Sequence, residues 1–308
     1  MTALQMKRRT KSGPPGDPRR VQDGFPSIDY TCFTVKPLSP TIGAEIHGLS
    51  LADGVSEKAQ AELHSALLEW KVLFFRNQPV SKEQFRTFGQ IWGKLMVPSM
   101  TAVDGEIPEV FELAKGANAR GEENIWHSDQ PWQVRPPSIT ILRAVEVPEY
   151  GGDTLFSDMA AAYDDLPAEV KEQVDNLDAE NVHPVLWGMS DYGPAHALSE
   201  EELDERRKMF PPQNHKVIRT HPETGRRAIY ADINHTKRLV GVSDEVSEYL
   251  MDQLVLRAAM PEYQCRFHWE NNSIAMWDNR TVQHYAASDY YPKVRVMQRM
   301  IVEGEEPK

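Results

Sequence analysis

The sequence predicts a mainly β protein with flanking helices, folded as a double-stranded β-helix, or jelly-roll, barrel. Short apolar runs recur after a helical start, and clusters of Gly, Pro, Asn and Asp separate them. Of the 308 residues, 40% are hydrophobic and 26% are charged, which is typical of globular domains. The sequence contains no internal repeat, phosphate loop or glycine fingerprint of a dinucleotide-binding fold. These observations favour a jelly roll with helices against one face.

The N-terminal third is predicted to combine short strands with two helices. Apolar or alternating runs indicate strands at residues 32–35, 44–47 and 72–75. A helix is expected to begin at Ser56 and to end near Trp70, because an apolar stripe of helical spacing follows the serine. Ser81 and Gln84 have the spacing of a capping box, which predicts the start of the second helix.

The middle and C-terminal parts are predicted to be rich in strands. Six further runs of this kind lie at residues 139–142, 154–156, 217–218, 228–230, 273–277 and 294–301. A long insertion separates the second of these runs from the third. It contains one helix near residues 167–177 and a charged, solvent-facing helix at about 199–209.

Residues 1–25 differ in composition from the rest of the chain. They hold six Lys and Arg residues, and Pro14, Pro15 and Pro18 interrupt them. The segment has no apolar run that could serve as the core of a signal peptide, so its composition does not support secretion. A flexible basic tail is the favoured interpretation, and an organelle-targeting segment is the alternative. Residues 26–308 are then expected to form a single domain.

The charge balance, the lack of a long apolar run and the cysteines argue against several classes of partner and site. The chain has 34 Lys and Arg against 46 Asp and Glu, so its net charge is −12, and a nucleic-acid partner is not expected. No run of about 18 apolar residues is present, so no membrane partner is expected either. Cys32 and Cys265 are far apart, which argues against a disulfide scaffold and a thiolate zinc site and suits the cytoplasm.

The segment Trp126-His127-Ser128-Asp129 carries the most specific local pattern. On a strand, residues i and i+2 point to the same face, so the His127 imidazole and the Asp129 carboxylate would project together. One nitrogen donor and one oxygen donor make up two-thirds of a facial triad for ferrous iron. The third ligand must be a distant histidine, and His284 lies after an apolar run, near a predicted barrel mouth.

Two arginines share one face of the last predicted strand. Arg295 and Arg299 have the same parity, and about 13 Å of strand rise separates them. Arginines inside a barrel are costly unless each meets an anion, so each is expected to bind its own. Two alternatives stay open: an edge strand with both arginines in water, or a pairing of Arg299 with an acidic residue of the insertion such as Asp191.

Taken together, the motifs of this chain resemble the taurine/2,4-D dioxygenase (TauD/TfdA) family of Fe(II)- and 2-oxoglutarate-dependent oxygenases. The similarity lies in Trp-His-Ser-Asp at 126–129, Gly-Gly-Asp-Thr-Leu-Phe at 151–156, Trp-Asp-Asn-Arg-Thr-Val-Gln-His-Tyr-Ala at 277–286 and the arginine pair. It extends from about Tyr30 to Glu303. The resemblance implies a double-stranded β-helix that uses Fe(II), 2-oxoglutarate and O2, and that releases succinate and CO2 while it hydroxylates a C–H bond.

The resemblance also implies a role for individual residues. His127, Asp129 and His284 match the iron ligands of the family. Thr154 and Arg295 match the pair that holds the distal carboxylate of 2-oxoglutarate. Arg299 matches a position that meets the anionic end of the substrate in sulfonate-using members. Asp129 is a carboxylate, whereas family halogenases have a small residue there, so hydroxylation is favoured over halogenation.

The sequence predicts a class of substrate rather than one compound. Taurine-using members have a histidine in the stretch that matches residues 94–100, and this chain has none there. Trp132, Val97 and Asn124 are the candidate substrate contacts besides Arg299. Met96, Met100, Trp187 and Tyr192 would make the pocket more apolar. We expect a small anionic organic substrate with an apolar body, namely an aryloxyalkanoate, alkyl sulfate, larger sulfonate or acyl amino acid.

Two other classes of function share part of this pattern. A metal hydrolase could use two histidines and one aspartate, but it does not need Thr154 and two inward arginines. A non-catalytic barrel that binds an anion would need the arginines and not the His-x-Asp motif. Many members of the family that this chain resembles are oligomers, so a homo-oligomer is expected.

Overall fold

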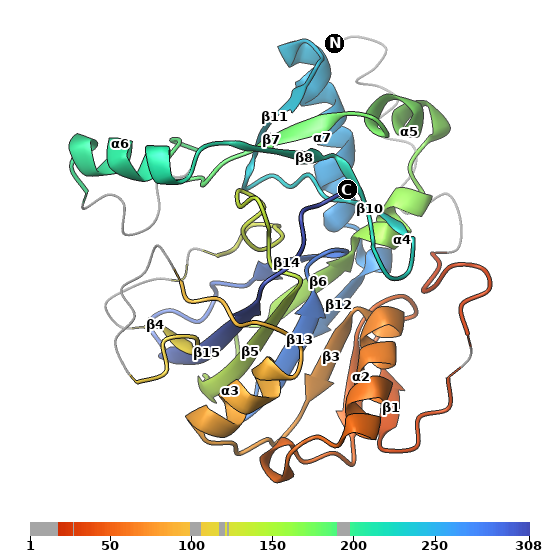
Figure 1. Cartoon of the computed structure of the whole chain (residues 1–308), viewed down its shortest axis with the longest axis vertical. Coiled ribbons are helices and arrows are strands. Elements are labelled where there is room, and N and C mark those ends of the chain that lie inside the picture. The colour runs from red at the N-terminus through yellow and green to blue at the C-terminus, as the bar shows by residue number, and fades with distance from the viewer. Residues whose placement is uncertain (1–17, 27, 99–105, 117–120, 122, 190–197) are drawn as a thin grey trace.

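The computed structural model describes residues 18–26, 28–98, 106–116, 121, 123–189 and 198–308 (Figure 1). Residues 1–17 of the predicted tail lie outside the described residues, as do Met100 and Tyr192. Arg20, inside the predicted tail, lies over the Trp70 ring at 4.3 Å and pairs with Glu69 at 2.9 Å. The tail boundary and the single domain over 26–308 stay predictions. No helix among the described residues is long and apolar enough to cross a membrane.

The largest element is a seven-stranded sheet with the strand order β1-β2-β3-β13-β5-β15-β4. Its members are β1 (Thr34–Pro37), β2 (Ala44–His47), β3 (Val72–Phe75), β4 (Phe111–Lys115), β5 (Ile139–Glu146), β13 (Ile274–Asp278) and β15 (Arg295–Val302). Strands β2 and β3 pair in parallel, and the other neighbours pair in antiparallel fashion. The C-terminal strand β15 therefore lies inside the sheet, next to β5.

A second, three-stranded sheet packs against one face of the first. It has the order β12-β6-β14 and consists of β6 (Thr154–Asp158), β12 (Gln264–Phe267) and β14 (Val282–Ala286). Buried aromatic residues fill the space between the sheets, and the Phe74 and Phe267 rings stack at 4.1 Å. The prediction of a mainly β jelly-roll fold with flanking helices is confirmed. Among the described residues, backbone pairing forms separate sheets rather than one closed barrel.

Two helices cover the other face of the large sheet (Figure 1). They are α2 (Glu57–Trp70) and α3 (Lys82–Gln90), preceded by the short helix η1 (Leu51–Asp53). The Ser56 hydroxyl caps α2, and Ser81 with Gln84 forms the predicted capping box. Both caps satisfy backbone N–H groups that have no partner within the helix. The helices bury Leu63 and Phe85 in a core shared with β3 and β15.

The insertion and the segments after it form a further apolar core. Its helices are α4 (Met159–Asp164), α5 (Ala168–Val174) and α7 (Asp244–Ala258), with η3 (Pro261–Tyr263) after α7. Its strands are β7 (Asp178–Asn181), β8 (Gln213–Lys216), β9 (Ile218–Thr220), β10 (Arg227–Ile229) and β11 (Thr236–Val240). The predicted charged helix is α6 (Glu200–Met209), whose described side chains are all outside the core. Figure 1 shows α6 extending away from the body of the protein.

Candidate active site

A backbone bridge joins the two histidines of the predicted triad. The His127 N–H donates to the His284 carbonyl at 3.1 Å, and the His284 N–H donates to the His127 carbonyl at 2.8 Å. His127 thus adds one more backbone segment beside β14, and the two imidazole centroids lie 4.2 Å apart. Ligand atoms of His127, Asp129 and His284 lie within 4.8 Å of one another. The structure therefore brings together three residues that the sequence separates by up to 157 positions.

The orientation and protonation of the histidines suit metal binding. The His127 Nδ1–H donates to the Ile125 carbonyl at 2.8 Å, which leaves Nε2 free to bind a cation. Burial lowers the pKa of His127 and lowers that of His284 well below the usual value, so both rings are neutral near pH 7. Neutral imidazole is the form that binds metals.

A chain of hydrogen bonds holds the Asp129 carboxylate. Its Oδ2 accepts from the Thr140 hydroxyl at 2.6 Å, and the Thr140 oxygen accepts from Asn279 Nδ2 at 2.7 Å. The Trp277 indole N–H donates to Asn279 Oδ1 at 2.9 Å. Burial alone would raise the pKa of Asp129, but Arg299 and the nearby histidines hold it well below the usual value. The carboxylate is therefore ionised and fixed in one orientation.

Arg295 places its guanidinium inside the protein. The residue is 9% exposed, and its Nε and Nη2 have no hydrogen-bond partner among the described residues. Trp269 and Tyr290 flank the guanidinium at 6.0 and 5.8 Å, and the Trp269 indole N–H donates to Thr154 Oγ1 at 3.0 Å. Gly152 lies beside Arg295 with a φ of +70°. A residue with a Cβ atom at this position would place that atom 3.1 Å from the Arg295 side chain.

This environment suits an anionic ligand. Burial lowers the pKa of Arg295, because removal from water disfavours the charged guanidinium. A planar guanidinium binds a carboxylate through two parallel hydrogen bonds, and both require free N–H groups. Arg295 thus lies near Trp269, which sequence reasoning missed and which holds Thr154, and its N–H groups without a described partner suit a carboxylate. Trp269 carries no motif, so its role could not be found from the sequence.

Arg299 contacts the triad itself. Its Nη2 donates to Asp129 Oδ1, and its buried Nε has no hydrogen-bond partner among the described residues. The side chain is 19% exposed, so the alternative of an arginine fully in water does not apply. The alternative partner Asp191 lies outside the described residues. Arg299 therefore has one carboxylate neighbour and one N–H group without a partner among the described residues.

A cavity of about 240 Å³, here named the triad cavity, lies against these residues. Its lining includes His127, Asp129, Arg299 and the predicted contact Trp132. Val97 instead lines a neighbouring cavity, one residue before Pro98 of the triad cavity. Asn124 is exposed and lies outside the described lining of both cavities.

Two further histidines line the triad cavity and were missed by sequence reasoning. Asp232 orients His235 by accepting from its Nδ1 at 3.1 Å, and it also accepts from the Ser128 backbone N–H at 3.2 Å. His183 packs edge-on against Trp132 at 5.0 Å, and burial lowers its pKa to about 4. Neutral His183 can donate one hydrogen bond into the cavity. The only signal in the sequence was their histidine identity, which ten positions share.

Comparisons with known proteins agree with this geometry. The sequence model of the "Taurine catabolism dioxygenase TauD, TfdA family" matches residues 34–301. An alkylsulfatase of Acinetobacter baylyi is 35% identical over 277 residues, which cover 88% of this chain and 85% of that protein. An alpha-ketoglutarate-dependent sulfate ester dioxygenase of Pseudomonas putida is 34% identical over 281 residues, with 89% and 90% covered.

Solved structures show the same relationship. A putative alpha-ketoglutarate-dependent taurine dioxygenase from Burkholderia xenovorans superposes with a TM-score of 0.76 at 34% identity, over 89% of this chain and 94% of that chain. The comparisons favour neither the metal hydrolase nor the non-catalytic barrel. The chain therefore belongs to the TauD/TfdA family and is a 2-oxoglutarate-dependent dioxygenase.

Proposed function

We propose that this enzyme hydroxylates the carbon that bears the sulfate group of an alkyl sulfate ester. The cation Arg299 at the triad cavity carries the proposal, because it offers a buried N–H group to an anionic head. Two of the similar proteins act on sulfate esters by name, which supports sulfate over carboxylate. Hydroxylation at that carbon gives an unstable sulfated hemiacetal, which releases sulfate and leaves an aldehyde.

His127, Asp129 and His284 are proposed to hold Fe(II). Two neutral imidazoles and one carboxylate, with ligand atoms within 4.8 Å of one another, form the donor set of a facial triad with open positions. With Fe(II) and O2 bound, the centre would supply the oxidative decarboxylation of 2-oxoglutarate to succinate and CO2 and the hydroxylation of the substrate. The ordered network around Asp129 keeps the carboxylate ionised and directed at this centre.

2-Oxoglutarate is the co-substrate of the family, and we place its distal carboxylate at Arg295 and Thr154. Arg295 Nε and Nη2, which have no partner in the part of the chain that the structure describes, support this placement. Trp269 fixes Thr154 by a hydrogen bond and closes one side of the guanidinium. Gly152 leaves room for the Arg295 side chain, because a Cβ at this position would crowd it.

Thr140→Val is expected to weaken Fe(II) binding by roughly 10- to 100-fold, the usual effect of losing a partner of a metal ligand. The change keeps the shape of the side chain and removes the hydrogen bond to Asp129. Anaerobic Fe(II) titration against a competing chelator would measure it. Thr87→Val on the exposed face of α3 is the matched control. Equal Fe(II) affinity in Thr140→Val and the parent would contradict the role of this hydrogen bond.

Arg299→Ala is the test of the proposed substrate head group. We expect near-normal binding of 2-oxoglutarate to the Fe(II) enzyme, poor saturation by alkyl sulfate, and more succinate formed per sulfate released. The guanidinium reads the substrate anion, so its loss uncouples decarboxylation from product formation. Two assays measure the effect: anaerobic 2-oxoglutarate titration and the ratio of succinate to sulfate. If 2-oxoglutarate binding and alkyl sulfate saturation both stay intact, Arg299 is not a substrate residue.

For assembly and compartment we propose a homo-oligomer in the cytoplasm without a nucleic-acid partner. The net charge of −12 supports the last point, and two distant cysteines suit a reducing compartment. Light scattering on the purified full chain would measure the number of subunits.

A further inference from the structure

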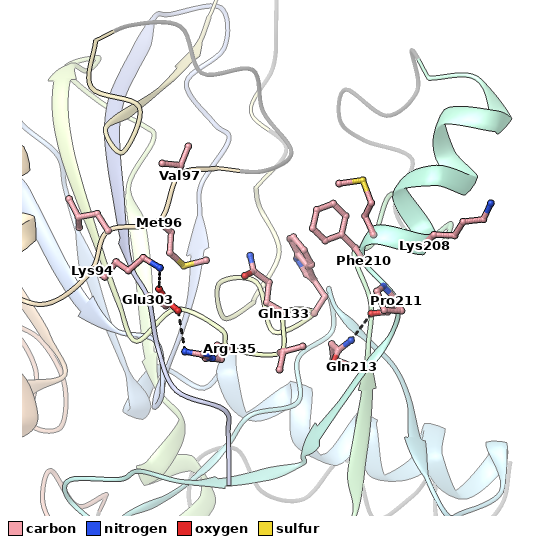
Figure 2. Close-up of a pocket in the computed structure, with 14 residues that line it drawn as sticks. Lys94, Met96, Val97, Gln133, Arg135, Lys208, Phe210, Pro211, Gln213 and Glu303 are labelled. Carbon is pink, nitrogen blue, oxygen red and sulfur yellow. Dashed lines mark hydrogen bonds and ion pairs between the residues drawn. The ribbon is translucent and has the colours of Figure 1, made fainter.

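A second and larger cavity lies beside the triad cavity. It has a volume of about 860 Å³, and we name it the outer groove (Figure 2). One side is formed by Met96 and Val97, which follow α3, and the other by Phe210 and Pro211, which follow α6. The two cavities share Trp132 in their linings. The outer groove thus adjoins the triad cavity at one aromatic side chain.

Trp132 stands between the two spaces. Its ring meets His183 of the triad cavity at 5.0 Å and Phe210 of the outer groove at 5.1 Å, both edge-on. The tryptophan itself is only 5% exposed, so these contacts hold it in place. A molecule that extends from the triad past Trp132 would enter the outer groove against the Phe210 ring.

Exposed apolar side chains gather in the outer groove beside polar and charged ones. Val97, Val134 and Met209 are 52%, 53% and 68% exposed, and all three line this one groove. Large exposed apolar side chains that gather in one depression mark a binding surface. Methionine side chains adapt to ligands of different shape, and Met96 and Met209 lie on opposite sides.

Charge in the groove does not favour a second anion. Lys94 pairs with Glu303 at 2.7 Å, and Arg135 pairs with the same carboxylate at 3.3 Å (Figure 2). Two of the three cations in the lining therefore already have a counter-ion. The occupant that fits this lining is an uncharged apolar chain.

The size of the triad cavity leads to the same occupant. Ligand pockets usually measure about 300–1,000 Å³, and the triad cavity, with about 240 Å³, lies below that range. It must also receive the reacting end of 2-oxoglutarate. A substrate with a long apolar body needs further space, and the outer groove provides it.

We propose that the outer groove binds the apolar tail of the substrate, while the anionic head and the reacting carbon stay in the triad cavity. The inference rests on the proposed function and deepens it: the substrate class is a sulfate ester of a medium or long alkyl chain. Trp132 determines specificity because the chain must pass it on the way into the groove.

A series of linear primary alkyl sulfates from butyl to decyl tests the proposal. With the Fe(II) enzyme and 2-oxoglutarate, kcat/KM is expected to rise with each methylene, by up to about fourfold when the methylene is fully buried. Parallel series of alkanesulfonates and alkanoates separate the identity of the head group from the role of the groove. If only another head group reacts, the sulfate assignment is wrong, and the dependence on tail length in that series still decides the role of the groove.

Val134→Trp is the variant that fills the groove without touching the triad cavity. We expect the ratio of kcat/KM for decyl over butyl sulfate to fall at least tenfold. Val246→Trp, an exposed valine on α7, is the matched control and should keep the parental ratio. A kcat/KM independent of tail length in all three series overturns the proposal. So does an altered oligomeric state of Val134→Trp with an unchanged ratio, because the groove would then be a contact between subunits. If no series binds or reacts, both the groove and the proposed function fail.

Discussion

Asp129→Ala is expected to abolish succinate formation, with residual activity below about 1% of the parent. Asp129 supplies the only negative charge among the three proposed ligands, and its removal also leaves the half-buried Arg299 without this carboxylate partner. An uncompensated cation beside the metal site opposes the binding of another cation. Loss of Fe(II) affinity and loss of turnover should therefore appear together.

The measurement combines succinate release, with and without added Fe(II), and an anaerobic metal titration. Circular dichroism verifies that the variant is folded, and Glu248→Ala on the exposed side of α7 serves as the control for a lost carboxylate. A folded Asp129→Ala enzyme that turns over normally without added iron would refute the assignment of the triad.

Arg295→Ala has the second-largest expected effect, on the affinity for 2-oxoglutarate. Loss of one partner of a buried, hydrogen-bonded charge pair costs on the order of 2–5 kcal/mol. The Kd for 2-oxoglutarate should rise by roughly 30- to several thousand-fold. Arg295 Nε and Nη2 have no partner within the described ranges, and the size of the effect follows from our proposal that both bind the carboxylate.

Anaerobic titration of the Fe(II) enzyme with 2-oxoglutarate measures this Kd without turnover. Arg295→Lys keeps the charge and loses the two parallel hydrogen bonds, so it should recover only part of the affinity. Fe(II) affinity should stay near the parental value, which distinguishes this variant from Asp129→Ala. An unchanged Kd would remove Arg295 from the co-substrate site.

The elements that the local sequence pattern predicted are those whose buried faces consist of regularly spaced apolar residues. Helix α2 begins after the predicted cap Ser56, and β3 matches the predicted run 72–75. Strand β15 buries Met297 between the sheets and Met300 under the helices, as the alternation of its residues requires. Such patterns can be read locally because each residue in a strand or helix faces one side only.

Helix α7 and strand β14 were not predicted from the sequence, and each omission has a physical reason. Helix α7 buries only Ser247, Leu250, Leu254 and Ala258, so its apolar stripe is narrow and its helical period is hard to see. Strand β14 contains Gln283, a polar residue that is nonetheless buried. Its side chain donates to the Ala231 carbonyl at 3.0 Å, a partner more than 50 positions away. Tertiary contacts alone make that residue compatible with a buried strand.

The sequence by itself determined which residue types could form the site: a His-x-Asp pair, a distant histidine and two arginines of equal parity. Only the tertiary structure decided which of them meet. The pairing of His127 with His284, the partners Thr140 and Asn279 of Asp129, and the contact of Arg299 with Asp129 all join distant parts of the chain. Side-chain parity and spacing are local properties of the backbone. Convergence on one cavity depends on how the two sheets pack, which no local pattern encodes.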